Sequence, residues 1–308
     1  MNNVYLVTKS NSTQTRQIDI GEAEARIPQE LGIRLSSLFM FDRLVFVEGI
    51  SDEDAIREWA SILGINLNQA NVGFIRMGGA RNFAHFATEE TLNFLAKRQV
   101  KMWFLIDRDE KEDAEIVRMH TMLGQDAKLQ VLSKREIENY LICPRAVRSF
   151  IEHKRLLLGA LKEQLPTEDE VRNKIDKCAE KLKQFAISKR VVKISCKPVY
   201  PETKVIFDNL QTQEAIDKIT ESIQAMINQL ETEKTNLKSV YTSKAEELEG
   251  TWKTKKMDIV PGDLLLDAVF KEYNLRFKKE KDTSKLASLM RKDEIDSEIK
   301  KVINEIVT

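Results

Sequence analysis

The amino-acid sequence predicts an α/β fold, in which a mainly parallel sheet is flanked by helices and carries an inserted helical hairpin. Residues 43–47 and 102–106 are nearly continuous apolar runs, which are typical of strands buried on both faces of a parallel sheet. Between residues 41 and 132, strand patterns alternate with helical patterns, as in repeated βαβ units. After about residue 145 the strand patterns largely stop and helical spacing dominates.

The elements follow in a regular order along the chain. A strand is expected at 4–8, then a second hairpin arm around Ile18 and Ile20, then a short helix at 22–32. In the α/β region we expect four strands, at 43–47, 72–77, 102–106 and 129–132. The helices between them are expected at 52–63, 81–97 and 111–123, where apolar residues recur at helical spacing.

Two longer helices are predicted in the second half of the chain. The first carries apolar residues in a 4-3-4-3 spacing at Val171, Ile175, Cys178, Leu182 and Phe185. The second repeats the spacing at Ile216, Ile219, Ile223, Met226 and Leu230. A link containing Pro198 and Pro201 joins them, so we expect an antiparallel hairpin that projects from the core. Gly250 and Pro261-Gly262 are expected to interrupt the return to the core before the closing helices.

Composition narrows the classes of function. Among the 308 residues, 49 Lys and Arg balance 49 Asp and Glu, so nucleic-acid binding would need a local basic surface. We expect that surface on the hairpin, at Lys181, Lys183, Lys189, Arg190 and Lys193. The scattered cysteines, Cys143, Cys178 and Cys196, argue against a disulfide framework or zinc site and favour a cytoplasmic setting. No apolar run is long enough for a membrane span, and no signal peptide is evident.

Acidic residues follow the strands of the predicted sheet. Glu48 directly follows the strand at 43–47, and an acid at the end of a buried strand is costly unless it is paired. Asp107 and Asp109 follow the strand at 102–106, and an extended backbone would point both to the same side. Asp52, in the first turn of the next helix, and Glu138, after the fourth strand, would join them at the same sheet edge. Each acid also has a simpler explanation than a shared site. Asp52 could stabilise the start of a helix, Asp107 and Asp109 could lie in a solvated loop, and Glu138 could be a surface charge.

Carboxylates gathered in this way would repel one another unless hard cations neutralise them. Oxygen ligands suit Mg²⁺ or Mn²⁺, and two such ions can activate a water and stabilise the leaving oxygen of a phosphodiester. Three lysines after Gly250, Lys253, Lys255 and Lys256, could neutralise charge on the phosphate, or could simply form a solvated basic turn. No Walker A loop and no Gly-x-Gly-x-x-Gly motif occurs, so no ATP site is expected in this chain.

The motif Glu48-Gly49 followed by Asp107-x-Asp109 resembles the hallmark of the Toprim domain, the metal-binding fold of topoisomerases, bacterial primases and several nucleases. More narrowly, four segments resemble the OLD ("overcoming lysogenization defect") family of ATP-dependent endonucleases. They are Val-Glu-Gly-Ile-Ser-Asp at 47–52, Gly-Gly-x-x-Asn at 78–82, Ile-Asp-Arg-Asp at 106–109 and Glu-Ile-Glu-Asn-Tyr-Leu at 136–141. The close resemblance covers about 41–142, and a fainter one lies at 252–266.

The resemblance implies a two-metal nuclease that nicks or cuts DNA, as part of a phage-defence or DNA-processing system. It implies that the metal ligands are Glu48, Asp52, Asp107, Asp109 and Glu138, with Glu136 as a neighbour. A lysine between Trp252 and Pro261 would act on the transition state, although Asp263 stands where a lysine would be sought. The alternatives are a non-catalytic metal-binding scaffold or assembly module, or another Toprim activity such as that of a primase or topoisomerase.

The resemblance also shapes the expected domains and partners. We expect residues 1–40 to be the remnant of a preceding ATPase-like domain, and 41–160 to form the Toprim core. Residues 161–250 would be the helical hairpin insertion, and 251–308 a return segment with C-terminal helices packing on the core. The family pairs this half with an ABC-type ATPase, so we expect an ATPase domain or subunit as a partner, as well as DNA and a second copy in a homodimer.

Overall fold

The computed structural model describes residues 4–9, 13–18, 41–125, 127–159, 161, 165–195 and 212–308. The first described element is an antiparallel hairpin of β1 (Val4–Lys9) and β2 (Thr13–Ile18). Its second arm comes a few residues earlier than expected. The helix expected at 22–32 lies outside the described residues.

A four-stranded parallel sheet forms the centre of the fold, as the sequence predicts. Its strands are β3 (Arg43–Val47), β4 (Val72–Arg76), β5 (Lys101–Ile106) and β6 (Ala127–Val131), in the spatial order β4-β3-β5-β6. All three neighbouring pairs are parallel, so the carboxyl ends of all four strands lie at the same edge. Since β3 and β5 are neighbours, the residues that follow Val47 and Ile106 are brought together there.

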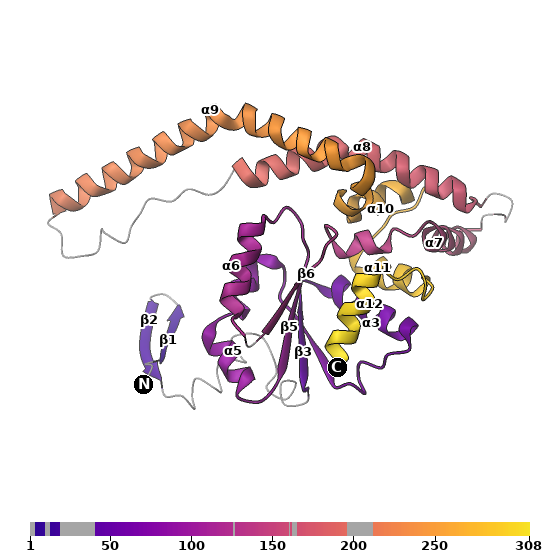
Figure 1. The fold of residues 1–308 in the computed structure, drawn as a ribbon, viewed down its shortest axis with the longest axis horizontal. Coiled ribbons are helices and arrows are strands. Elements are labelled where there is room, and N and C mark those ends of the chain that lie inside the picture. The colour runs from indigo at the N-terminus through magenta and orange to yellow at the C-terminus, as the bar shows by residue number, and fades with distance from the viewer. Residues whose placement is uncertain are drawn as a thin grey trace.

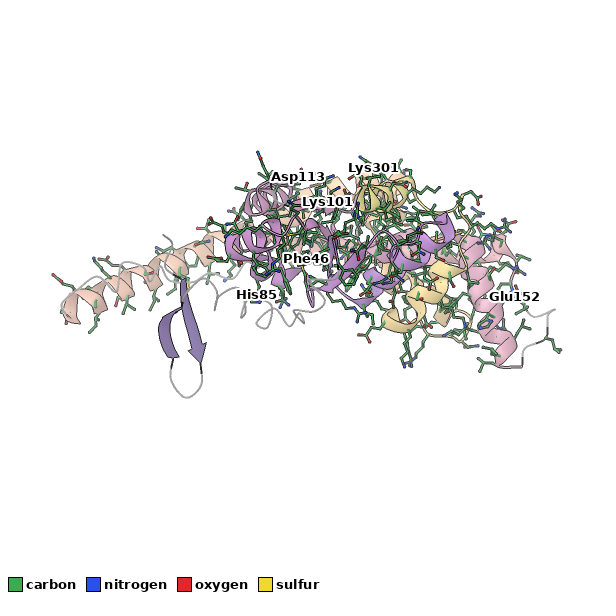
Figure 2. The ribbon with its side chains drawn as sticks, turned by 90° about the horizontal axis from the view of Figure 1, so that it is seen from below. Phe46, His85, Lys101, Asp113, Glu152 and Lys301 are labelled. Carbon is green, nitrogen blue, oxygen red and sulfur yellow. The ribbon has the colours of Figure 1, made fainter. Side chains whose placement is uncertain are left out.

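Helices cover both faces of the sheet (Figure 1). One face packs against α5 (Glu89–Ala96) and α6 (Asp113–Leu123), and the other against α3 (Ile50–Leu63) and α12 (Ser297–Val307), with α11 (Lys279–Ser288) packed on α3. Alternate residues of β3 enter two separate apolar clusters, because successive side chains of a strand point to opposite faces. Phe46 stacks on Phe104 with 4.3 Å between ring centroids on the face of α5 and α6. Figure 2 shows Phe46 inside the body of the protein and Glu152 at its periphery.

The single helix expected at 81–97 is wrong, because the segment is broken. It contains a 3₁₀ turn at Ala80–Asn82, then α4 (Phe83–Phe86), then α5. Thr88 causes the second break: its backbone is extended, and its hydroxyl accepts a hydrogen bond from the Thr91 N–H (3.3 Å) as an N-cap.

The second half of the chain is helical. After a 3₁₀ turn at Ile137–Leu141 come α7 (Pro144–Leu157), α8 (Glu168–Ser195), α9 (Thr212–Ile259) and α10 (Gly262–Lys271). The antiparallel arrangement of α8 and α9 agrees with the predicted hairpin, and α9 extends well beyond the end of α8 (Figure 1). Helix α9 continues through Gly250, is kinked at Lys255, and ends before Val260-Pro261.

The predicted apolar stripes of the hairpin are only partly buried. Val171, Ile175 and Cys178 of α8 are buried in the core, whereas the side chain of Phe185 is exposed. On α9, the side chains of Ile216 and Leu230 are exposed as well, with no described residue covering them. Among the described residues, no helix is both long and apolar enough to cross a membrane.

Candidate metal centre

Glu48 lies where β3 ends and holds two other segments in place. Its Oε1 accepts a hydrogen bond from the Asp107 N–H (3.1 Å), and its Oε2 accepts one from the Ala80 N–H (3.2 Å). The second contact depends on the turn at Gly78 and Gly79, whose φ angles of +74° and +111° are strained for other residues. Burial raises the pKa of Glu48 above its ordinary value, and the charges of nearby acids add to that rise.

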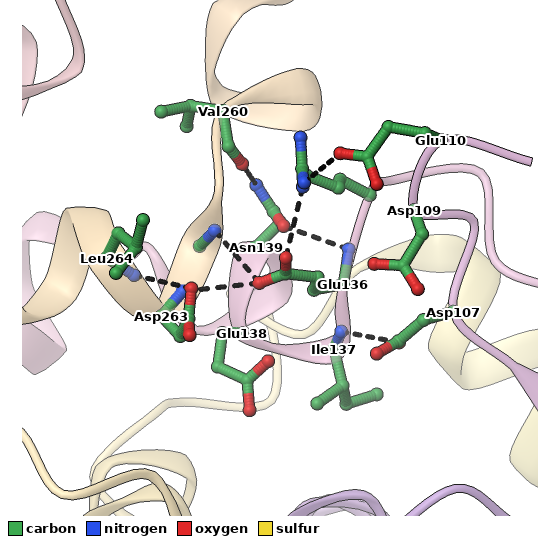
Figure 3. A network of polar contacts seen from close by, with 12 residues as sticks. Asp107, Asp109, Glu110, Glu136, Ile137, Glu138, Asn139, Val260, Asp263 and Leu264 are labelled. Atoms are coloured by element: carbon green, nitrogen blue, oxygen red, sulfur yellow. Dashed lines mark hydrogen bonds and ion pairs between the residues drawn. The ribbon is translucent and has the colours of Figure 1, made fainter. Parts of the chain in front are cut away.

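Asp107, the residue after β5, is the most strongly perturbed acid of the site. Its Oδ1 accepts a hydrogen bond from the Ile137 N–H (2.9 Å), which ties the end of β5 to the 3₁₀ turn after β6 (Figure 3). Burial raises its pKa well above the ordinary value, and the charges of Asp52, Glu48 and Glu138 raise it further. These four carboxyl groups are therefore close enough to repel one another.

Asp52 has two roles at the start of α3. Its Oδ2 accepts a hydrogen bond from the Gly49 N–H (2.7 Å), so it helps to cap the helix. This agrees with the alternative interpretation of Asp52 as an acid that stabilises the start of a helix. It is also buried and faces the cluster, since its charge raises the pKa values of Asp107 and Glu138. Burial raises the pKa of Asp52 itself.

Glu138 is completely buried in the turn after β6. Its Oε2 accepts a hydrogen bond from Lys279 Nζ (3.0 Å), and its Oε1 is buried without a hydrogen-bond partner among the described residues. Burial raises the pKa of Glu138 from 4.5 to about 7. A buried carboxylate oxygen without a partner is costly, so it marks a place where a further ligand would be stabilising.

Two lysines partly neutralise these acids. Lys279, at the start of α11, is held against Glu138; burial alone would lower its pKa, but the charges of Glu138, Asp107 and Asp52 raise it above the ordinary value. Lys111, buried in the loop after β5, donates to the Asp107 carbonyl oxygen (2.8 Å) and lies 3.8 Å from Glu48 Oε1. Sequence reasoning missed both, because an isolated lysine in a charged segment carries no spacing that would distinguish it.

The expectation that an extended backbone points Asp107 and Asp109 to the same side is wrong. Strand β5 ends at Ile106, and Asp109 lies in a turn with φ +45°, where its N–H donates to the Arg135 carbonyl oxygen (2.8 Å). Its half-exposed side chain lies 3.4 Å from Lys111 Nζ, at the rim of the cluster.

Glu136 is engaged in contacts away from the cluster. Its Oε1 accepts from Arg135 Nε (3.0 Å), and its Oε2 accepts from the N–H groups of Gly262 (3.2 Å) and Asp263 (3.4 Å) at the start of α10 (Figure 3). A carboxylate at this end of a helix is favoured by the free N–H groups and the helix dipole. The geometry therefore gives Glu136 a structural role.

The three lysines predicted after Gly250 lie in different surroundings. Lys256 pairs with Asp176 (2.5 Å) and Glu180 (3.1 Å) of α8, which occupies its charge away from the acids of the sheet edge. Lys253 is exposed. Lys255 interrupts the regular backbone of α9 and lines a cavity that also includes Asp109.

The donor set fits divalent cations. As they stand, no three Asp, Glu, His or Cys side chains of the described residues are arranged to hold one ion together. However, Glu48, Asp52, Asp107 and Glu138 supply only oxygen, they repel one another, and one buried oxygen of Glu138 is free. Hard cations such as Mg²⁺ or Mn²⁺ would neutralise the repulsion between the carboxylates and would give the unpartnered oxygen of Glu138 a ligand contact.

Comparisons with known proteins identify the same region. Residues 39–109 match the family described as overcoming lysogenization defect protein-like, TOPRIM domain. TOPRIM domains generally bind divalent metals, and the match supports a Toprim-type function in general. Among solved structures, the chain is similar to the C-terminal region of the Xanthomonas campestris pv. campestris OLD protein, with 12% identity and a TM-score of 0.36, over 87% of this chain and 95% of that one. No curated protein gave a match to the sequence.

Proposed function

Since residues 39–109 match the OLD-like TOPRIM domain family, we propose that this protein is a divalent-metal-dependent DNA endonuclease. The observation that carries the proposal is the gathering of Glu48, Asp52, Asp107 and Glu138 at one sheet edge, with a buried carboxylate oxygen left free. The reaction would be hydrolysis of a phosphodiester, by nicking or by cutting.

The four carboxylates would hold two ions of Mg²⁺ or Mn²⁺, with Asp109 at the rim. When bound, such ions activate a water and stabilise the charge of the leaving oxygen. Asp107 and Glu48 are held in position by backbone N–H groups, which leaves each of them oxygen capacity on the side of the cluster. Lys279 holds Glu138 in place as a counter-ion.

We assign the phosphate-facing cation to Lys111 in place of the three lysines expected after Gly250. Lys111 lies beside Glu48 and Asp109 and lines the two cavities that Asp109 also lines. A buried ammonium at this position is suited to neutralise charge that develops on a phosphate. Lys256, in contrast, is already paired with two acids of α8.

The test is cleavage of supercoiled plasmid with Mg²⁺ or Mn²⁺. We expect nicking by the wild type and a loss of about a hundredfold or more in Asp107→Ala, because metal ions supply several kcal/mol to such reactions. The matched control is Asp113→Ala, which removes an aspartate whose side chain is 89% exposed on α6. Metal binding without any cleavage would contradict the proposal and support a metal-binding scaffold.

The cellular compartment and the partners belong to the same proposal. The free thiols of Cys143 and Cys178 agree with a reducing, cytoplasmic compartment. The ATPase partner and the homodimer stay predictions.

A further inference from the structure

Asp109 lines two cavities. The first, of about 620 Å³, lies between the Gly78-Gly79 turn, the loop after β5 and the end of α8. The second, of about 340 Å³, lies between the same loop and the facing surfaces of α8 and α9. Asp109, Glu110 and Lys111 line both cavities, and Glu48 of the proposed metal centre lines the first, so the two cavities adjoin at the rim of that centre.

Helix α8 contributes to both cavities. Lys193 lines the first and Arg190 lines the second, and residues three apart on a helix lie on the same face. The last turns of α8 therefore run along both cavities and connect them.

The walls of the two cavities carry cations that are available to an anionic ligand. Among the described residues, Lys193 pairs with Glu115 (3.9 Å) and Arg190 with Glu247 (3.0 Å), and such surface pairs are worth little. Arg81 in the first cavity and Lys255 in the second are exposed and form no hydrogen bond or ion pair with any described residue.

The sizes and linings of the cavities indicate the kind of ligand. Each has the volume of a small-molecule site, which suits a nucleotide unit and is far too small for a duplex. The first cavity is lined by apolar side chains, Phe83, Ala84 and Met119, and by charged side chains of both signs. The apolar side chains suit the base of an unpaired nucleotide, and the cations suit its phosphate.

We propose that the two cavities form a track for one unpaired strand of nucleic acid, which passes beside the metal centre. Phosphates on one side of the reacting position contact Arg81 and Lys193, and those on the other side contact Arg190 and Lys255. The proposal rests on the proposed function and adds its substrate class, namely single-stranded DNA or an unpaired stretch within a duplex. It also narrows the basic surface expected on the hairpin, since Arg190 and Lys193 line these cavities whereas Lys181 and Lys183 do not.

The test measures binding apart from cleavage. The probe is a fluorescent single-stranded DNA of mixed sequence and about 20 nucleotides, longer than most single-strand sites, compared with its blunt duplex in EDTA. The variant is Arg81→Glu/Lys255→Glu. The matched control, Lys292→Glu/Lys301→Glu, reverses two exposed lysines near the C-terminus, and Figure 2 shows Lys301 on the outer surface. Circular dichroism checks that both variants fold.

The wild type should bind the single strand more tightly than the duplex. The Arg81→Glu/Lys255→Glu variant should lose about tenfold in affinity, and its salt slope should fall by roughly 1.4, because each lost phosphate contact removes about 0.7. The control variant should bind as the wild type does. Equal binding by the two variants, or tighter binding of the duplex, would overturn the track.

The outcome is separable from that of the nicking assay. If the protein binds a single strand through Arg81 and Lys255 but never cleaves, the single-strand track is supported and the nuclease proposal is contradicted. If the protein nicks plasmid but the charge reversals do not affect its binding, the nuclease proposal is supported and the track is contradicted.

Discussion

Lys279 Nζ lies 3.0 Å from Glu138 Oε2, although the two residues are 141 positions apart in the sequence. This pair places one positive charge among the acids, yet burial still raises the pKa of Glu138 to about 7. Lys279, even together with Lys111 beside Glu48, therefore does not fully compensate the cluster. The remaining repulsion, together with the free Oε1 of Glu138, is what a divalent cation would relieve.

Removing the lysine should destabilise the fold. Lys279→Met should lower the free energy of unfolding by about 1–3 kcal/mol at about pH 8, since the completely buried Glu138 loses its partner although the Lys279 side chain is itself 41% exposed. The double variant Lys279→Met/Glu138→Gln should recover at least about 1 kcal/mol of that loss, because it removes both charges of the pair. Urea denaturation measures both values, and simple additivity of the two single effects would contradict the pairing.

The stability of the metal-free protein should depend on pH through Glu138. Because burial raises its pKa from 4.5 to about 7, the folded state binds more protons than the unfolded state between these values. The free energy of unfolding should therefore fall as the pH rises through this window, by roughly 3 kcal/mol from this group. Comparison with Glu138→Gln isolates the effect, since that variant lacks the titrating group. A constant difference between the two proteins from about pH 5 to about pH 8 would refute the assignment.

Asp107→Asn should raise stability while it removes function. The amide oxygen can still accept from the Ile137 N–H, but one charge of a mutually repelling set is lost. Without metal, the melting temperature should rise by a few degrees, corresponding to about 1–2 kcal/mol. Mn²⁺ should then stabilise the wild type and leave the variant almost unchanged, as thermal melts with and without the ion would show. A variant less stable than the wild type in EDTA would contradict the repulsion.

Glu136 and Glu138 should behave as opposites although both were expected beside the metal. Glu136→Gln should cost about 1–3 kcal/mol, because it weakens a charge-assisted contact to Arg135 and to the start of α10. Its Mn²⁺ affinity and nicking should stay within about threefold of the wild type, whereas Glu138→Gln should lose tenfold or more in metal affinity. Titration calorimetry on both variants checks this, and the reverse ranking would make Glu136 the ligand.

The sequence could predict the sheet and the acids that follow its strands. Continuous apolar runs gave β3 and β5, and parallel neighbours bring the residues after them to one edge, so Glu48 and Asp107 meet as predicted. Glu138 joins them because Asp107 Oδ1 accepts a hydrogen bond from the Ile137 N–H, which holds the turn after β6 at this edge.

The cations of the site could not be predicted in this way. The position of Lys279 depends on how α11 docks against α3 and the turn after β6, which is a long-range packing outcome. The resemblance pointed instead to lysines after Gly250, but α9 continues through that glycine and directs Lys256 to α8. Local signals also failed at Thr88, where one side-chain cap divides a segment with helical spacing into two helices.

Mn²⁺ binding, followed by electron paramagnetic resonance, tests most directly the idea that the four acids are a metal centre. The wild type should bind two ions for each chain, and Asp107→Asn should lose at least one of them, while Asp113→Ala should match the wild type. If the wild type binds no Mn²⁺, or if Asp107→Asn binds as many ions with equal affinity, the acids at this sheet edge do not form a metal centre.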